Sequence, residues 1–218
     1  MITILSDYWP AFFSGASVTL AVSALVWLIG ISVGFALGVA AARLPWGSQF
    51  ISGLTFVVSS IPALAILFWF HYPAQTILGV VIDPFFTTVF VLSVLNIVFV
   101  ADVVKFSAER LAKEYLEAAY IHGWPRAKAT WLIEIPLIVR GAASRIVFIQ
   151  VTMLHMTLFA SLISLDELFR VAQRVNSREY KPVEVYTLIS AFYFLISAPL
   201  LIVSSYLHKK FGRDFSER

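Results

Sequence analysis

Five long apolar stretches dominate the sequence, and each is long enough to cross a membrane as a helix. They run from about residue 12 to 42, 50 to 70, 85 to 104, 142 to 163 and 185 to 207. A bilayer core requires about 20 mostly apolar residues per helix. The stretches are too long for strands and lack a strict alternation of apolar and polar residues. The sequence therefore predicts an all-α integral membrane protein with five transmembrane helices.

Charged residues are scarce in the chain as a whole. Only 13% of the 218 residues are charged, against about 25% in a typical soluble domain. The absence of cysteine excludes disulfides, thiolate metal sites and a cysteine nucleophile. The start of the chain has neither a basic segment nor a small-residue cleavage site, so we expect no removed signal peptide. The net charge of +3 fits basic loops of a membrane protein and does not indicate a nucleic-acid partner.

Lysine and arginine are distributed unevenly among the segments that connect the stretches. The segment before residue 12 and the connection from 71 to 84 contain none, whereas the connection from 105 to 140 contains six. The last eleven residues, 208 to 218, contain four, and four more between 164 and 184 are balanced by acidic residues. Because basic residues concentrate in cytoplasmic loops, we expect an N-terminus outside the cell membrane and a C-terminus in the cytoplasm.

The segment from residue 105 to 140 has a helical pattern of its own. Ser107 is a candidate N-cap, and Gly123 is placed to end a first helix in a left-handed conformation. Pro125 suits the first turn of a second helix, where its missing N–H would be unpaired in any case. Pro136 is expected to kink or restart the helix before the fourth apolar stretch. The segment is therefore expected to form two short helices joined at an angle.

The first of these helices carries a small, shallow surface. Ala118 and Ala119 leave room for another protein to approach closely, and Glu117 would then pair with a cation on that partner. The same pattern also suits an amphipathic helix pair that lies at the membrane interface and only closes the bundle. Residue spacing alone leaves docking and capping equally open.

This segment resembles the EAA motif of permease subunits of type I ATP-binding-cassette (ABC) importers. Glu117-Ala118-Ala119 is followed by Gly123 and then by Ile133-Glu134-Ile135-Pro136. The resemblance implies one permease domain over residues 1–218, with a cytoplasmic coupling-helix hairpin at 105–140 between the third and fourth spans. It also implies a separate ATPase homodimer that binds ATP and Mg²⁺, while this chain itself holds no cofactor. The residues implied to couple to that ATPase are Glu117, Ala118, Ala119, Gly123 and Pro136.

Other segments are similar to the branch of this family that imports polar amino acids and opines. The matching residues include glycines at positions 30, 34 and 38, Pro62 with Leu64, and Glu167-Leu168. The resemblance implies a multi-pass protein of the bacterial inner membrane with a periplasmic N-terminus. It further implies a small polar substrate, which a periplasmic binding protein delivers and which crosses the membrane by alternating access.

The fourth apolar stretch departs most from that branch. Where the branch carries a Lys-Asp-Thr-Ser-Leu run, this chain has residues 155 to 159, of which only Thr157 matches. No carboxylate is present there to hold a cationic substrate group. We therefore expect a second, different permease to supply the charged half of the substrate site; a homodimer whose ligand has an apolar portion is the alternative. The candidate pathway residues are Ile149, Thr152, His155, Met156 and Thr157.

Three features predict local structure. The glycines at positions 30, 34 and 38 form a smooth stripe for close helix packing. Pro62 frees a backbone carbonyl and predicts a bend in the second span. Asp102 and Lys105, three residues apart, predict an ion pair whose lysine extends toward the membrane interface.

Two other functions are compatible with an all-helical membrane chain. A haem-binding anchor subunit would use His71 and His155 as axial ligands, but their expected depths in the membrane differ. A secondary transporter is disfavoured because no inverted repeat is visible. The chain also lacks the Gly-x4-Gly-Lys-Ser/Thr phosphate loop, so we expect a transport subunit and not an enzyme.

Overall fold

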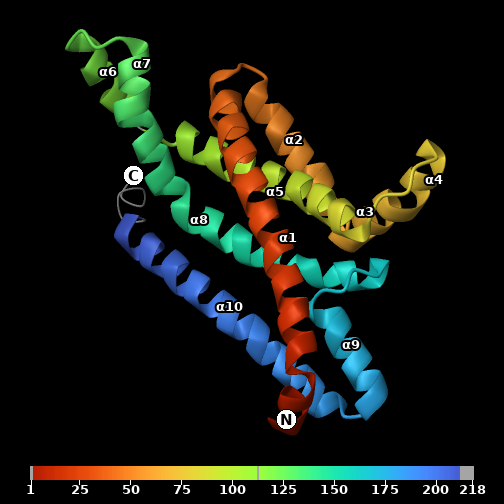
Figure 1. Ribbon diagram of the computed structural model, residues 1–218. Helices are drawn as coiled ribbons and strands as arrows, with labels where there is room; N and C mark the ends of the chain where they lie inside the picture. The colour runs from red at the N-terminus through yellow and green to blue at the C-terminus, as the bar shows by residue number, and fades with distance from the viewer. Residues whose placement is uncertain (1, 112, 212–218) are drawn as a thin grey trace.

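The computed structural model describes residues 2–111 and 113–211, and each regular element in these ranges is helical (Figure 1). Four of the helices are long and apolar enough to cross a membrane, or five if one bent pair counts as a single span. The predicted all-α membrane architecture is confirmed. The helices are α1 (Ile2–Arg43), α2 (Gly47–Ser60), α3 (Ala63–Trp69), α4 (Gln75–Leu78), α5 (Pro84–Glu109), α6 (Lys113–Ile121), α7 (Arg126–Ala129), α8 (Ile135–Met156), α9 (Leu168–Glu179) and α10 (Pro182–Phe211).

The second span is broken in the middle. The helical segments on either side of Ile61 and Pro62 are bent by 86°. Ile61 is extended (φ −107°, ψ 128°), as sterics require of a residue that precedes proline. The sequence predicts this bend correctly, but a loop that begins at residue 71 is wrong, because the chain stays helical to Leu78. A π-helical segment, Phe70–Ala74, and α4 continue the chain instead.

Helices α1 and α5 pack closely along the glycine stripe. A Cβ atom on Gly34 would lie 2.8 Å from the carbonyl oxygen of Ile97, and one on Gly38 would lie 2.6 Å from that of Ala101. Real Cβ atoms do not approach backbone oxygens this closely, so only glycine allows α5 to lie so near. The predicted role of the stripe is confirmed.

We expect Gly38→Ala to destabilise the fold by about 1–3 kcal/mol, the usual range for overpacking, because the Ala101 carbonyl cannot move aside independently. In a chain of this size, each kcal/mol lowers the melting temperature by about 2–4 °C. Gly53→Ala is the matched control, since nothing lies within 4 Å of its added Cβ. Thermal unfolding of both variants in detergent measures the difference, and equal melting temperatures would contradict the packing account.

A buried polar network joins α1, α5 and α8. The side-chain amide of Asn96 donates to the carbonyl of Val26 at 2.9 Å and to Oε1 of Gln150 at 2.8 Å. The indole N–H of Trp27 donates to the carbonyl of Gln150 at 3.0 Å. Unpaired polar groups are costly away from water, so this network fixes the relative register of the three helices.

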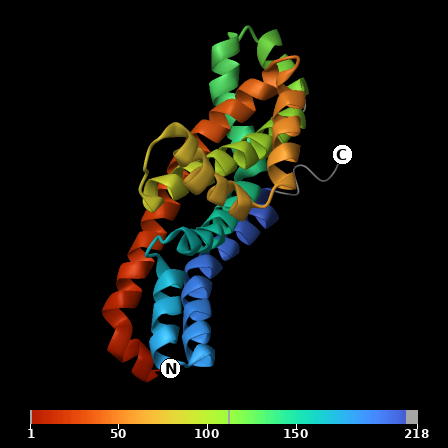
Figure 2. The same ribbon diagram turned by 90° about the vertical axis from the view of Figure 1, so that its right-hand side faces the viewer.

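Apolar side chains gather in two main clusters. The first joins α1, α3, α5 and α8, with the fully buried Val26, Leu92 and Met153 among its members. The second packs α9 against α1 and α10 through Phe12 and Val185. Figure 2 shows these three helices side by side at one end of the molecule. The bundle is therefore closed at that end by a short helix that does not itself span the membrane.

The C-terminal part of α5 is tied to α2 by a buried lysine. Lys105 Nζ lies 2.7 Å from Asp102 Oδ1 and donates to Ser52 Oγ at 2.6 Å. The predicted ion pair is confirmed, but the predicted extension of Lys105 to the membrane interface is wrong. The residue is only 4% exposed, because its charge is satisfied inside the bundle by two partners.

Candidate functional site

Helices α6 and α7 form a hairpin that projects beyond the rest of the bundle (Figure 1). The chain turns at Gly123, whose φ is 75°. The N–H of Gly123 donates to the Tyr120 carbonyl and that of Trp124 to the Ala119 carbonyl, at 2.9 and 3.0 Å. This is the helix end predicted from the glycine. Pro125 caps α7 one position earlier than the predicted first turn.

Ser107 does not begin the hairpin. It lies inside α5, which continues to Glu109, and its hydroxyl donates to the carbonyl of Ile138 at 3.1 Å. The prediction of Ser107 as an N-cap is therefore wrong, and α6 begins only at Lys113. Ser107 instead links the end of α5 to the start of α8.

The outward surface of the hairpin is uncovered. Glu117 and Ala118 are exposed, whereas Ala119 is buried and packs inward. Large apolar side chains of the same segment are also exposed: Ile121 is 84% exposed and Trp131 is 69% exposed. An exposed carboxylate together with exposed apolar side chains on one projecting segment is typical of an interaction surface.

The hairpin is joined to α1 by an ion pair that sequence reasoning missed. Arg43, the last residue of α1, lies 2.6 Å from the Glu134 carboxylate, and Thr130 donates to the same carboxylate at 3.0 Å. Glu134 ends the π-helical segment Thr130–Glu134, which runs directly into α8. Pro136 lies in the first turn of α8, so of the two predicted outcomes the helix restarts there, directly after the π-helical segment. The only local signal is an acidic residue inside the apolar Ile-Glu-Ile-Pro run, which indicates a cationic partner but does not identify it.

The candidate pathway residues on α8 lie in different surroundings. Ile149 and Met156 are half-buried against the first apolar cluster. The hydroxyl of Thr152 donates to the Phe148 carbonyl at 3.2 Å. Thr157 is buried, donates to the Leu154 carbonyl at 2.7 Å and begins a 3-10 helix, Thr157–Ile163.

His155 is the exposed member of the candidate pathway. Its Nε2 lies 2.8 Å from Ser197 Oγ on α10, and its ring centroid lies 6.0 Å from that of Tyr193. The other histidine considered as a haem ligand, His71, has different partners, since its Nδ1 lies 3.3 Å from Thr87 Oγ1. The structure thus brings His155 together with two polar residues of α10.

Glu167 is a buried acid immediately before α9, a helix that lies away from the hairpin (Figure 1). Its carboxylate caps α9 by accepting from the N–H groups of Phe169 and Arg170 at 2.9 and 2.8 Å. The Tyr193 hydroxyl also donates to it, at 3.2 Å, and Thr19 lies at 3.5 Å. Burial raises the pKa of this carboxyl to about 7, although the two backbone hydrogen bonds act in the opposite direction. One acid therefore joins α1, α9 and α10.

The sequence indicates only a loop between the fourth and fifth apolar stretches. The structure has a helix there, α9, whose outer face is basic. Its apolar side contacts α1 and α10, whereas Arg170, Arg174 and Arg178 line a surface pocket on the other side. Arg174 pairs with Asp166. Arg178 extends the positive face toward the end of the helix.

Comparison with known proteins decides among the functions that such a bundle allows. Residues 30–217 match the family of binding-protein-dependent transport system inner membrane components. The chain belongs to this family. The resemblance drawn from the EAA motif is confirmed, and the haem anchor and the secondary transporter are set aside. As an inner membrane component, the chain is a transport protein of the membrane.

Curated relatives of this inner membrane component align over almost its full length. The probable glutamine ABC transporter permease protein GlnM of Bacillus subtilis is 23% identical and covers 98% of this chain and 99% of its own length. The nopaline transport system permease protein NocM of Agrobacterium fabrum is 23% identical, over 90% of this chain and 86% of its own.

Solved structures show the same fold. A crystal structure of an amino acid ABC transporter with histidines superimposes with a TM-score of 0.81 at 23% identity, covering 94% of this chain and 96% of that one. The inward-facing MetNI methionine ABC transporter gives 0.74 at 16% identity, covering 92% and 98%.

Proposed function

We propose that this inner membrane component is the permease subunit of an ATP-driven importer for polar amino acids or amino-acid derivatives such as opines. The observation that carries the proposal is the projecting α6–α7 hairpin, with Glu117 and Ala118 uncovered and Glu134 ion-paired to Arg43 of α1. The names of the relatives, which include glutamine and nopaline permeases, support the substrate class.

The proposed coupling starts at α6. A separate ATPase homodimer binds ATP and Mg²⁺ and holds α6 in a surface groove, with Glu117 paired to a cation and Ala118 at the closest approach. Ala119, predicted at the same contact, packs inward and supports α6 from behind. When the two ATPases close, α6 moves with them. The movement reaches α8 through the continuous helical segment from Arg126 to Ile163. It reaches α1 through the ion pair between Arg43 and Glu134. The spans then alternate between outward and inward access.

The proposed orientation places the hairpin and the C-terminus in the cytoplasm and the N-terminus in the periplasm, with five spans if the bent pair crosses once. Basic residues near the hairpin support it, since Arg43, Arg126 and Lys128 all lie at that end. At the other end, Arg170 and Arg178 of α9 offer a positive surface to the periplasmic binding protein. A complementary acidic surface on that protein would accelerate docking.

The proposed substrate pathway follows α8, with His155 as its polar contact. Ser197 orients the imidazole from α10, so the ring offers one directed nitrogen to a polar ligand. No carboxylate stands among Ile149, Thr152, His155, Met156 and Thr157. We therefore favour a heterodimer in which a different permease supplies the acidic half of the site.

A new acid in this pathway tests its location. We expect Met156→Asp to change uptake of cationic relative to neutral amino acids by about tenfold, because one charged hydrogen bond is worth roughly 1.5 kcal/mol or more. Met153→Leu, a volume-conserving change in the buried cluster, is the control that leaves selectivity unchanged. Unchanged uptake of every amino acid by Met156→Asp would place the substrate elsewhere.

Affinity purification of the tagged chain from native membranes tests the assembly. We expect a cytoplasmic ATPase and a second, different permease to co-purify, and a periplasmic binding protein to join after crosslinking. Uptake of labelled amino acids by the reconstituted complex tests the function itself. Recovery of a stable complex without any ATPase would overturn the proposal, whereas recovery of one permease species alone would correct only the heterodimer.

A further inference from the structure

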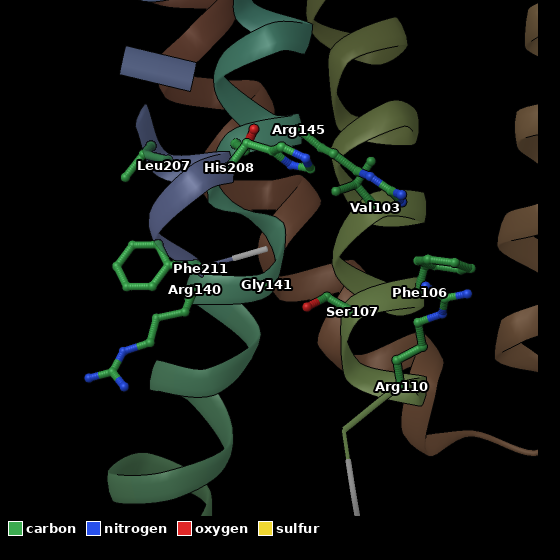
Figure 3. Close-up of a pocket in the computed structure, with 11 residues that line it drawn as sticks. Val103, Phe106, Ser107, Arg110, Arg140, Gly141, Arg145, Leu207, His208 and Phe211 are labelled. Carbon is green, nitrogen blue, oxygen red and sulfur yellow. The ribbon is translucent and has the colours of Figure 1, made fainter. Parts of the chain in front are cut away.

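A cavity of about 230 Å³ lies between α5, α8 and α10, near the hairpin end of the bundle (Figure 3). Pockets that enclose a drug-sized ligand usually measure about 300–1,000 Å³, so this one suits a smaller group. Every charged residue in its lining is basic, and apolar side chains including Phe106 and Phe211 form its walls. The basic lining therefore favours a small anion over a cation.

Two of the arginines share one aromatic ring. The guanidinium carbons of Arg110 and Arg145 lie 4.3 and 5.1 Å from the centroid of Phe106. Figure 3 shows Arg145 reaching from α8 toward α5, where Phe106 and Arg110 lie. Cation–π attraction holds the two like charges near each other, and both remain able to donate hydrogen bonds to a ligand.

No acidic side chain of the described residues neutralises this cluster. The salt bridges found in residues 2–111 and 113–211 involve other cations, and none includes Arg110, Arg145 or His208. Each guanidinium presents a planar set of N–H donors that matches the oxygens of a phosphate group. The donors of this cluster therefore suit an anion with several acceptor oxygens.

We propose that Arg110, Arg145 and His208 form a binding site for a phosphate-bearing anion. The apolar walls and the location at the end of the α10 span favour the phosphodiester of an anionic lipid, because basic pockets between membrane helices bind such headgroups. A free phosphate ion offers the same oxygens and is the other possible source. The site is separate from the coupling surface and does not depend on the proposed substrate.

Occupancy would join two helices that otherwise touch little. Arg110 directly follows the last residue of α5 and His208 belongs to α10, and these two helices make few direct contacts with each other. An anion bound by both bridges them through α8, which carries Arg145. The site would therefore hold α10 in place at the end of the bundle nearest the hairpin.

Titration of the purified full-length chain with two probes tests the site. Native mass spectrometry counts bound dioleoyl phosphatidylglycerol against dioleoyl phosphatidylcholine, and thermal unfolding in the presence of inorganic phosphate reports the free ion. We expect Arg110→Gln and Arg145→Gln, made singly, each to weaken phosphatidylglycerol binding about tenfold, since a charged hydrogen bond is lost. Lys209→Gln removes a neighbouring exposed charge outside the cavity and should change binding less than twofold.

The outcomes separate the sources. Loss of phosphatidylglycerol binding in both arginine variants, with Lys209→Gln unchanged, supports a lipid site. Stabilisation by inorganic phosphate that both arginine variants lose supports a free-phosphate site. Equal lipid binding by all variants, or no response to either probe, overturns the proposal. Arg110→Lys retains the charge and covers the case in which Arg110→Gln does not fold, and it should weaken binding through loss of the planar donor fork.

Discussion

The Glu117→Arg variant is expected to insert into the membrane normally and to lose nearly all substrate uptake. Glu117 is exposed on α6, so its replacement leaves the packing of the bundle unchanged. If it pairs with a cation on the ATPase, arginine places like charges in contact, which costs several kcal/mol. Docking should weaken about 100-fold or more, and stimulation of ATP hydrolysis should be lost with uptake.

Glu109→Arg is the matched control for this charge reversal. Glu109 ends α5, is exposed and lies close to the hairpin in the chain, but it is not on α6. Uptake of labelled amino acids and ATPase rates in reconstituted vesicles measure both variants. If Glu117→Arg transports as well as Glu109→Arg, α6 is not the coupling surface, and the alternative that it only closes the bundle is restored.

The turn between α6 and α7 provides an independent test of the same surface. Gly123 has a φ of 75°, a conformation that costs about 1–2 kcal/mol for residues with a Cβ and more for β-branched ones. We expect Gly123→Val to reduce uptake about tenfold by displacing α6. Asparagine tolerates this conformation, so Gly123→Asn should retain most uptake. Equal loss in both variants would mean that side-chain volume, and not the turn, causes the defect.

Sequence reasoning succeeded where one segment determines its own structure. The turn at Gly123 requires only a left-handed residue after a helix, and the bend at Pro62 requires only a missing N–H with a restricted neighbour. The glycine stripe of α1 is also recognisable from its own segment, because small residues at four-residue spacing indicate a close helix contact. These features depend on nearby residues, so they were predictable.

Features that depend on distant partners were not predictable from one sequence. Arg43 and Glu134 are ninety-one residues apart, and nothing in either local segment indicates the other. Lys105 was expected to extend outward, but Ser52 of the preceding span satisfies it inside the bundle. Residues 168–179 are too polar for a span, so the sequence indicates only a loop there, whereas contacts with α1 and α10 stabilise the helix α9.

Glu167 has the second large predicted effect, and it concerns stability as a function of pH. Its folded-state pKa of about 7 lies above the ordinary value of 4.5. Between these values the folded chain binds a proton that the unfolded chain releases, so stability falls as pH rises from about 4.5 to 7. The full difference is about 3 kcal/mol. Above pH 7 both states are deprotonated and the loss is complete.

Glu167→Gln should remove this pH dependence while keeping an oxygen that accepts from the N–H groups of Phe169 or Arg170. Glu167→Ala should cost about 2–4 kcal/mol at pH 5, because the cap of α9 is lost and a cavity replaces the buried side chain. Melting temperatures of the purified chain at pH 5 and pH 8 measure both, with the exposed Glu109→Gln as the variant that keeps the wild-type profile. If the melting temperatures of Glu167→Gln change with pH as those of the wild type do, groups other than Glu167 titrate between pH 5 and pH 8. Tyr193 contacts both Glu167 and His155. A confirmed profile would therefore mean that only the side chain of Tyr193 separates a titrating acid from the candidate substrate pathway.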